Sequence, residues 1–113
     1  MAHGKSDILR ANSRIKCCLL CKLCQGERSF PGYLLNLSLR GAEFSSRHPF
    51  AKNSSITISV RMPETEESIL LEGTIVRVEG DTSDWHKEVY RCGVRLHSLP
   101  TNFLLLLKTQ LTR

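Results

Sequence analysis

The amino-acid sequence predicts an all-β fold with a C-terminal α-helix, in which six short strands form an antiparallel barrel. Apolar and polar residues alternate in six segments, which is typical of strands with one buried and one solvated face. Turn-forming residues separate these segments, and no helical segment lies between them, which favours antiparallel pairing. After Pro100 the pattern changes to a leucine-rich run. Because closing a sheet removes its exposed edges, a closed or nearly closed barrel is expected.

Length and composition indicate one soluble domain. The chain has 113 residues, which is enough for one hydrophobic core and not comfortably enough for two. Its formal net charge of +5 favours a partner that carries phosphate groups. The longest uninterrupted apolar run, Phe103–Leu107, is too short to cross a bilayer, and the N-terminus lacks the apolar centre of a secretion signal. We therefore expect no membrane insertion.

The first half of the chain predicts a polar arm and three strands. Residues 1–12 lack periodicity, so we expect a flexible N-terminal arm. A first strand is expected over Ile15–Cys24, a second from about Tyr33 to Leu39, and a short third strand from Gly41. Residues 25–32 contain Gly and Pro and are expected to form a loop.

The second expected strand is the most regular. Leu35, Leu37 and Leu39 are expected on its buried face. Asn36 and Ser38 are expected on its solvated face, and Gly41 follows where the backbone turns. On its own, this polar row has two interpretations, an anion-binding platform and an ordinary solvated strand face.

The second half predicts three more strands and a helix. The strands are expected over Ile56–Met62, Ile69–Val78 and Val89–His97, and the imperfect alternation around Gly73 indicates a bulge or a barrel corner. The single barrel domain is expected to span 13–113.

A terminal helix is expected over about 101–112, because Pro100 precedes a run of good helix formers. Four consecutive leucines, Leu104–Leu107, point in nearly every direction around such a helix. Two arrangements remain open. In one, the helix is sunk in its own barrel. In the other, it contacts a partner or forms a homodimer.

Four of the five cysteines crowd into the first expected strand. Cys18, Cys21 and Cys24 have a spacing found in zinc and iron–sulfur sites. In a strand, however, residues three apart point to opposite faces, so we predict no metal site. Cys17, Cys21 and Cys92 are expected to be core residues. An odd number of cysteines in this arrangement indicates a reducing, cytoplasmic compartment rather than a disulfide framework.

Two short motifs mark the arm and the second strand, Arg-x-x-x-Arg and, about twenty residues later, Asn-x-Ser-x-x-Gly. They comprise Arg10, Arg14, Asn36, Ser38 and Gly41. A Gly-x-Ile-Val-Arg segment at 73–77 and a Gly-Val-Arg-Leu segment at 93–96 follow. In this order, on a six-strand-plus-helix pattern, the chain resembles the PilZ domain, a bacterial receptor for the second messenger cyclic di-GMP. The resemblance covers about residues 8–111.

The resemblance implies a six-stranded split barrel with cyclic di-GMP on its outer surface. The first motif would lie in a mobile arm that folds over the ligand, and the second on a barrel strand. Arginine suits such a ligand because a guanidinium pairs bidentately with phosphate or with the guanine edge. The implied ligand-binding residues are Arg10, Arg14, Asn36, Ser38, Gly41 and Arg77. For Arg77, a solvated charge at a strand end is an equally good interpretation.

Two positions depart from the family pattern. Asn36 stands where many members have Asp, and an amide has only one accepting oxygen, so a lower affinity is expected. Leu9 stands where many members have a further Arg. Without that guanidinium, we expect one bound ligand molecule rather than a stacked pair.

Three classes of function follow. The first is a receptor that binds cyclic di-GMP and relays the signal to an effector protein in motility, pilus or exopolysaccharide control. The second is a PilZ-like interaction adaptor that acts without ligand. The third is a small basic barrel for single-stranded nucleic acid, which normally needs a platform of surface aromatics that is not evident here. We expect no nucleic acid polymer as partner, no cofactor, and no enzymatic activity because no catalytic set appears.

Overall fold

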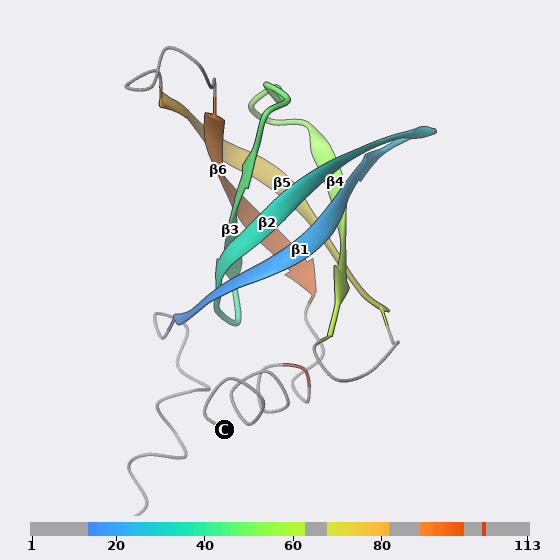
Figure 1. Cartoon of the computed structure of the whole chain (residues 1–113), viewed down its shortest axis with the longest axis vertical. Coiled ribbons are helices and arrows are strands. Elements are labelled where there is room, and N and C mark those ends of the chain that lie inside the picture. The colour runs from blue at the N-terminus through green and yellow to red at the C-terminus, as the bar shows by residue number, and fades with distance from the viewer. Residues whose placement is uncertain (1–13, 63–67, 82–88, 99–102, 104–113) are drawn as a thin grey trace, which may run out of the picture.

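The protein is a closed six-stranded antiparallel barrel (Figure 1). The structure is a computed structural model and describes residues 14–62, 68–81, 89–98 and 103. The strands are β1 (Ile15–Gln25), β2 (Arg28–Leu37), β3 (Gly41–Ser46), β4 (Ser55–Arg61), β5 (Ser68–Asp81) and β6 (Val89–Ser98). Their order around the barrel is β1-β2-β3-β6-β5-β4, and every neighbouring pair is antiparallel. The predicted barrel is therefore confirmed.

One hydrophobic core fills the barrel. Its fully buried side chains come from successive strands and include Leu23, Leu34, Phe44, Ile58 and Ile75, each 0% exposed. Burial of one such side chain stabilises a fold by about 1.5–3 kcal/mol. Phe103 is also buried in this core. The rest of the helix predicted over about 101–112 lies outside the described residues, as does the predicted arm over 1–12.

The β1–β2 hairpin is longer than predicted. The expected loop over 25–32 is wrong, because β2 begins at Arg28 and only Gly26 and Glu27 form the turn. Gly26 has a φ of 59°, which glycine adopts without steric cost. Pro31 lies inside β2, one residue beyond the last pair of the β2–β3 ladder, Gly32 and Ser46. On that side, the missing N–H of proline breaks no hydrogen bond of the ladder.

A bulge interrupts β2 at Leu35. The β2–β3 register shifts between Leu34 and Asn36, and Leu34 and Leu37 are the fully buried residues. The predicted buried face of Leu35, Leu37 and Leu39 is therefore wrong at Leu35, since a bulge adds one residue to the strand and changes the alternation. A second prediction is also wrong, because Ser38 is only 3% exposed instead of facing water.

The bulge expected near Gly73 is confirmed. The β5–β6 register shifts between Glu72 and Gly73 and again between Ile75 and Arg77. The two shifts change which β5 side chains face outward, and Val76 and Arg77 are both exposed. No helix in the described part of the chain is long and apolar enough to cross a membrane.

Candidate functional site

Arg14 of the first motif meets Asn36 of the second motif at the start of β1. Arg14 lies immediately before β1, and its Nη1 donates a 2.8 Å hydrogen bond to Oδ1 of Asn36 in β2. The antiparallel register places Lys16 opposite Asn36, which keeps the beginning of β1 beside the end of β2. Arg14 and Lys16 are exposed, so a pair of cationic side chains flanks the Asn36 amide.

Ser38 and Gly41 close the connection between β2 and β3. The Ser38 N–H donates to the Gly41 carbonyl at 2.8 Å, and the Gly41 N–H donates to Ser38 Oγ at 3.2 Å. The Ser38 hydroxyl also donates to the Gly41 carbonyl at 3.3 Å. A side chain at Gly41 would place its Cβ 3.1 Å from the Val94 carbonyl. These two residues therefore form a tight turn, and Asn36 lies just before it.

Arg77 is held by a carboxylate on β3. Its Nη2 donates to Oε2 of Glu43 at 2.6 Å, and Nη2 of Arg91 donates to the other oxygen, Oε1, at 2.6 Å. Glu43 is 8% exposed overall. Each carboxylate oxygen has a charged donor, as a carboxylate with so little contact to water requires. Arg77 Nε also lies 3.4 Å from the carboxylate of Glu79.

These groups form one row across the outer face of the barrel. Lys16 pairs with Asn36, Asn36 with Glu43, Glu43 with Gly93, and Gly93 with Arg77. The row crosses β1, β2, β3, β6 and β5, which lie side by side (Figure 1). We call it the polar row.

Gly93 is the position in the polar row that lets Arg77 reach Glu43. A Cβ at Gly93 would lie 3.3 Å from both Nε and Nη2 of Arg77. The guanidinium therefore lies against the backbone of β6 and extends toward β3. The backbone of Glu43 is one strand spacing, about 5 Å, from that of Asn36. The Arg77 guanidinium thus reaches β3, the strand next to β2, although its own strand is three strands away from β2 in the barrel order.

The structure places five of the six predicted site residues near one another on the barrel. Arg14 and Asn36 are in direct contact, and Arg77 joins the same row through Glu43. Ser38 and Gly41 lie at the adjacent turn, and the Ser38 hydroxyl is engaged within that turn. Arg10 lies outside the described residues.

Sequence reasoning missed Glu43 and Arg91. Glu43 is the single charged residue in the short β3 segment, Gly-Ala-Glu-Phe-Ser-Ser, which was a weak signal for an outward-facing carboxylate. Its pairing with Arg91 joins residues 48 positions apart, and only the β3–β6 register brings them together.

The five cysteines are free thiols at different depths in the barrel. Within the described residues no group of three or more His, Cys, Asp or Glu is placed to hold a metal ion. Cys17 is half-buried, Cys21 and Cys92 are buried, and Cys18 is exposed. Burial raises the pKa of Cys17 to about 11, of Cys21 to about 12 and of Cys92 to about 11. These three thiols are therefore protonated at neutral pH.

Solved structures share this fold. The PilZ domain of YcgR from Escherichia coli with c-di-GMP is 14% identical, with a TM-score of 0.70 and 88% of each chain covered. MrkH of K. pneumoniae in its apo state is 12% identical, with a TM-score of 0.67, and the match covers 91% of this chain and 48% of MrkH. The inhibitor of motility MotI (DgrA) from Bacillus subtilis is 16% identical, with a TM-score of 0.63, and the match covers 88% of this chain and 50% of MotI. The chain thus spans about half the length of MotI and MrkH.

The family model of the PilZ domain matches residues 8–113, which is nearly the whole chain. None of the curated proteins is significantly similar to it in sequence. The solved structures agree with the family match at the level of the fold. The chain therefore belongs to the PilZ domain family.

Proposed function

We propose that this PilZ domain is a receptor that binds cyclic di-GMP at the polar row and relays the signal to an effector protein. The observation that carries the proposal is the 2.8 Å hydrogen bond between Arg14 and Asn36, which joins the two motifs at one place on the outer face of the barrel. The YcgR PilZ domain, whose structure contains c-di-GMP, has the same fold. The polar row would then be the surface that receives the ligand.

The chemistry of the Arg14–Asn36 pair suits a cyclic dinucleotide, which carries two phosphodiester charges and two guanine rings. A guanidinium has five N–H donors, and Arg14 uses one of them on Asn36. The remaining N–H donors have the planar arrangement that allows bidentate pairing with a phosphate or with guanine O6 and N7. Arg10 precedes Arg14 by four residues and would approach the ligand from the arm.

Arg77 would contact the ligand from the β5 side. Its side chain is 49% exposed, so it is accessible, while Glu43 fixes the direction of its guanidinium. Ser38 and Gly41 would act mainly by shaping the turn that holds Asn36. In this account, Glu43 and Gly93 are positioning residues, because they act on the ligand through Arg77.

Signal relay would follow from ordering of the arm, which presents a changed surface to an effector protein in the bacterial cytoplasm. Motility, pilus function and exopolysaccharide secretion are the candidate outputs. We propose binding without catalysis, one ligand molecule per chain, and self-association through residues 101–112 as one route of relay.

A second candidate is an adaptor that works without ligand. One observation favours it: the side chains at the polar row already form hydrogen bonds and ion pairs with one another. Asn36 accepts a hydrogen bond from Arg14, Glu43 accepts one from Arg77, and Glu79 forms an ion pair with Arg77. Cyclic di-GMP must therefore compete with these internal pairs.

Isothermal titration of the full chain in reducing buffer separates the two candidates. Cyclic di-GMP is expected to bind with micromolar or tighter affinity and a ligand-to-protein ratio of one. Cyclic di-AMP, which has the same phosphates and lacks the guanine edge, is the matched control and is expected to release no heat. Absence of heat with both nucleotides would favour the ligand-independent adaptor.

A further inference from the structure

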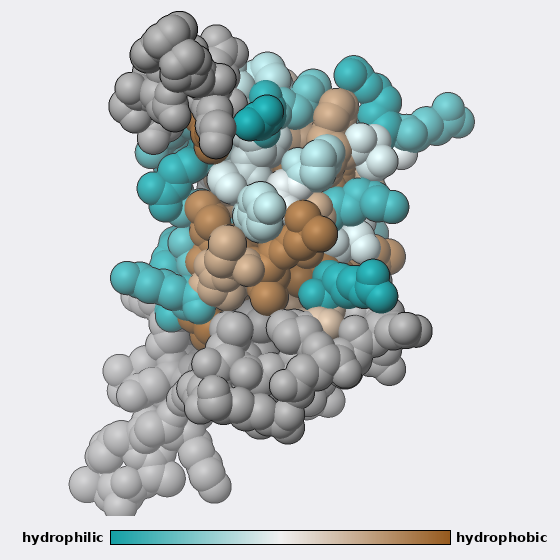
Figure 2. Space-filling view, viewed as in Figure 1, coloured by the Kyte–Doolittle hydropathy of each residue, from teal (hydrophilic) through white to brown (hydrophobic). Residues whose placement is uncertain are grey.

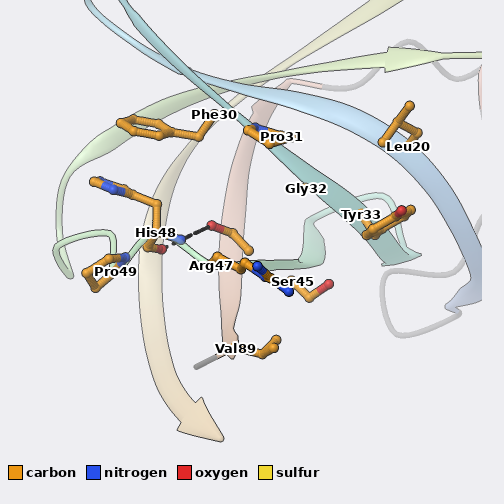
Figure 3. A pocket seen from close by; sticks show the side chains of 11 residues that line it. Leu20, Phe30, Pro31, Gly32, Tyr33, Ser45, Arg47, His48, Pro49 and Val89 are labelled. Atoms are coloured by element: carbon orange, nitrogen blue, oxygen red, sulfur yellow. Dashed lines mark hydrogen bonds between the residues drawn. The ribbon is translucent and has the colours of Figure 1, made fainter. Parts of the chain in front are cut away.

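A preformed apolar groove lies on the outer face of the barrel, away from the turn that follows Asn36. Its volume is about 630 Å³, and it lies between β1, β2, the end of β3, the segment 47–49 and the start of β6 (Figure 3). Two of its residues are large, exposed apolar side chains, Leu20 at 61% and Tyr33 at 49%. In Figure 2, apolar side chains gather near the middle of the view, over the region in which Figure 1 draws β1 and β2. We call this cavity the Leu20–Tyr33 groove.

The wall opposite Leu20 and Tyr33 is rigid. The rings of Phe30 and His48 stack with their centroids 3.8 Å apart and an interplanar angle of 12° (Figure 3). The Phe50 ring packs edge-on against Phe30 at 5.5 Å. Ser46 Oγ accepts from the His48 N–H at 2.8 Å and donates to the His48 carbonyl at 3.0 Å, which fixes the segment after β3. The groove therefore requires little ordering before it binds, which favours affinity.

The charges around the groove favour an acidic occupant. Arg47 lines the groove, and the Arg28 guanidinium lies 5.0 Å from the Phe30 ring centroid at the same wall. None of the described residues that line the groove is acidic. The whole chain has a formal net charge of +5, so two copies carry net charges of the same sign. A partner with carboxylates gains attraction at this surface, whereas a second copy meets repulsion.

The aromatic geometry argues against single-stranded nucleic acid. Bases bind such surfaces by stacking on open aromatic faces. The Phe30 ring is already engaged by His48 and by Arg28. Tyr33 is the one aromatic side chain of the described groove lining with large exposure. An apolar side chain of a peptide can pack against the Tyr33 ring without needing further stacking partners.

We propose that the Leu20–Tyr33 groove docks an acidic peptide segment of a partner protein. Apolar side chains of that segment would pack against Leu20 and Tyr33, and its carboxylates would pair with Arg47 and Arg28. The volume of the groove is in the range of natural binding pockets and suits one or two apolar anchor side chains. This inference deepens the proposed function, because it rests on the proposed relay to an effector protein and states the chemical class of the effector segment.

The groove and the polar row are different surfaces joined by one contact. Leu20 pairs with Tyr33, Tyr33 with Ser45, and Ser45 with Arg91. Arg91 then reaches Glu43 in the polar row. None of the residues lining the groove belongs to the Arg14–Asn36 pair, so docking and ligand binding are measured separately.

A displayed library of random twelve-residue peptides tests the inference without assuming a sequence. The immobilised full chain is the bait, and the Leu20→Ser variant is used for counter-selection. Leu70→Ser is the matched control, since Leu70 is also 61% exposed but does not line the groove. We expect the peptides enriched on the wild-type chain to combine several Asp or Glu residues with an aromatic or aliphatic anchor. Their affinity is expected to fall about ten-fold or more with Leu20→Ser and to stay within about two-fold with Leu70→Ser.

Charge reversal supplies the second readout. Arg47→Glu is expected to remove the preference for acidic peptides, because it places a like charge beside the carboxylates. The inference is overturned if no peptides distinguish wild type from Leu20→Ser, if the enriched peptides are neutral or basic, or if a single-stranded oligonucleotide or a second copy of the chain binds the groove instead. Cyclic di-GMP is also titrated into Leu20→Ser, so that ligand binding and peptide docking are tested independently. If the wild type enriches acidic peptides but does not bind cyclic di-GMP, only the receptor proposal is overturned.

Discussion

Arg14 donates a 2.8 Å hydrogen bond to Asn36, across 22 residues of sequence. The contact occupies the single oxygen of an amide, which is the atom that a guanine N–H would also seek. The proposed ligand would therefore have to compete with Arg14 for Asn36 Oδ1 or share this atom with it. The consequences of this relationship are testable by substitution.

Asn36→Asp is expected to bind cyclic di-GMP more tightly, by about three- to ten-fold. A carboxylate provides two accepting oxygens, so Arg14 and a guanine edge no longer compete for one atom, and the bonds become charge-assisted. Asn36→Ala is the control and is expected to bind more weakly than wild type. Calorimetric affinities that are equal for Asp and Ala would contradict this role of Asn36.

Glu43→Ala is expected to lower both stability and ligand affinity. The substitution leaves Arg77 and Arg91 without their shared acceptor, and since both guanidinium side chains are about half exposed, the loss of stability is about 1–2 kcal/mol. Chemical denaturation measures this loss. Glu79→Ala is the control, since Glu79 is 62% exposed and lies 3.4 Å from Arg77, and it is expected to cost below about 0.5 kcal/mol. Equal effects of the two variants would remove Glu43 as the residue that positions Arg77.

Gly93→Ala is expected to weaken ligand binding through Arg77 alone. The new Cβ would lie 3.3 Å from Arg77 Nε and Nη2, so the guanidinium must shift away from Glu43. Gly80→Ala is the control, because its Cβ would make ordinary contacts at 3.5 Å with Tyr90. In an Arg77→Ala background, Gly93→Ala should have no further effect on affinity. Additive losses in the double variant would contradict the proposed mechanism.

The buried cysteines predict how stability depends on pH. Burial raises the pKa of Cys21 from 9.0 to about 12 in the folded chain. The stabilisation from its protonated thiol is complete below pH 9, and it is lost as the pH rises through the folded-state pKa because the unfolded chain ionises first. The stability difference between wild type and Cys21→Ala should therefore shrink from pH 9 toward pH 12. A stability difference that stays constant from pH 9 to pH 12 would contradict the raised pKa of Cys21.

Alkylation provides a second test of the cysteines. Cys18 is exposed and is expected to react with iodoacetamide before Cys17, Cys21 and Cys92. Mass spectrometry of peptides after brief exposure at neutral pH measures the order. Modification of Cys21 ahead of Cys18 would show that the first strand opens more readily than its burial implies.

The sequence predicted the strands well because their apolar residues alternate and each strand has one buried face. It did not predict the bulge at Leu35, since a shift of register depends on how β2 pairs with β3. The loop expected over 25–32 failed because Pro31 was taken as a breaker, whereas the end of the β2–β3 ladder accommodates it.

In the candidate site, too, some residues were expected from the sequence and others were not. Arg14 and Asn36 were expected to bind ligand because their motifs resemble those of the PilZ family, and the barrel places the two residues in contact. Glu43 and Arg91 were missed, because their partnership exists only once β3 and β6 are neighbours. Arg14 and Asn36 belong to short motifs that can be found in the sequence, whereas Glu43 and Arg91 come together only through tertiary contacts and leave a much weaker signal.

The central claim is that the Arg14–Asn36 pair receives cyclic di-GMP. Calorimetric titration of wild type, Arg14→Ala and Arg61→Ala tests it most directly. Both arginines are exposed, but of the two only Arg14 is hydrogen-bonded to Asn36. Loss of one charge-assisted contact is expected to weaken binding of Arg14→Ala by about 1.5–3 kcal/mol, with Arg61→Ala unchanged. Equal affinity of Arg14→Ala and wild type would contradict the account.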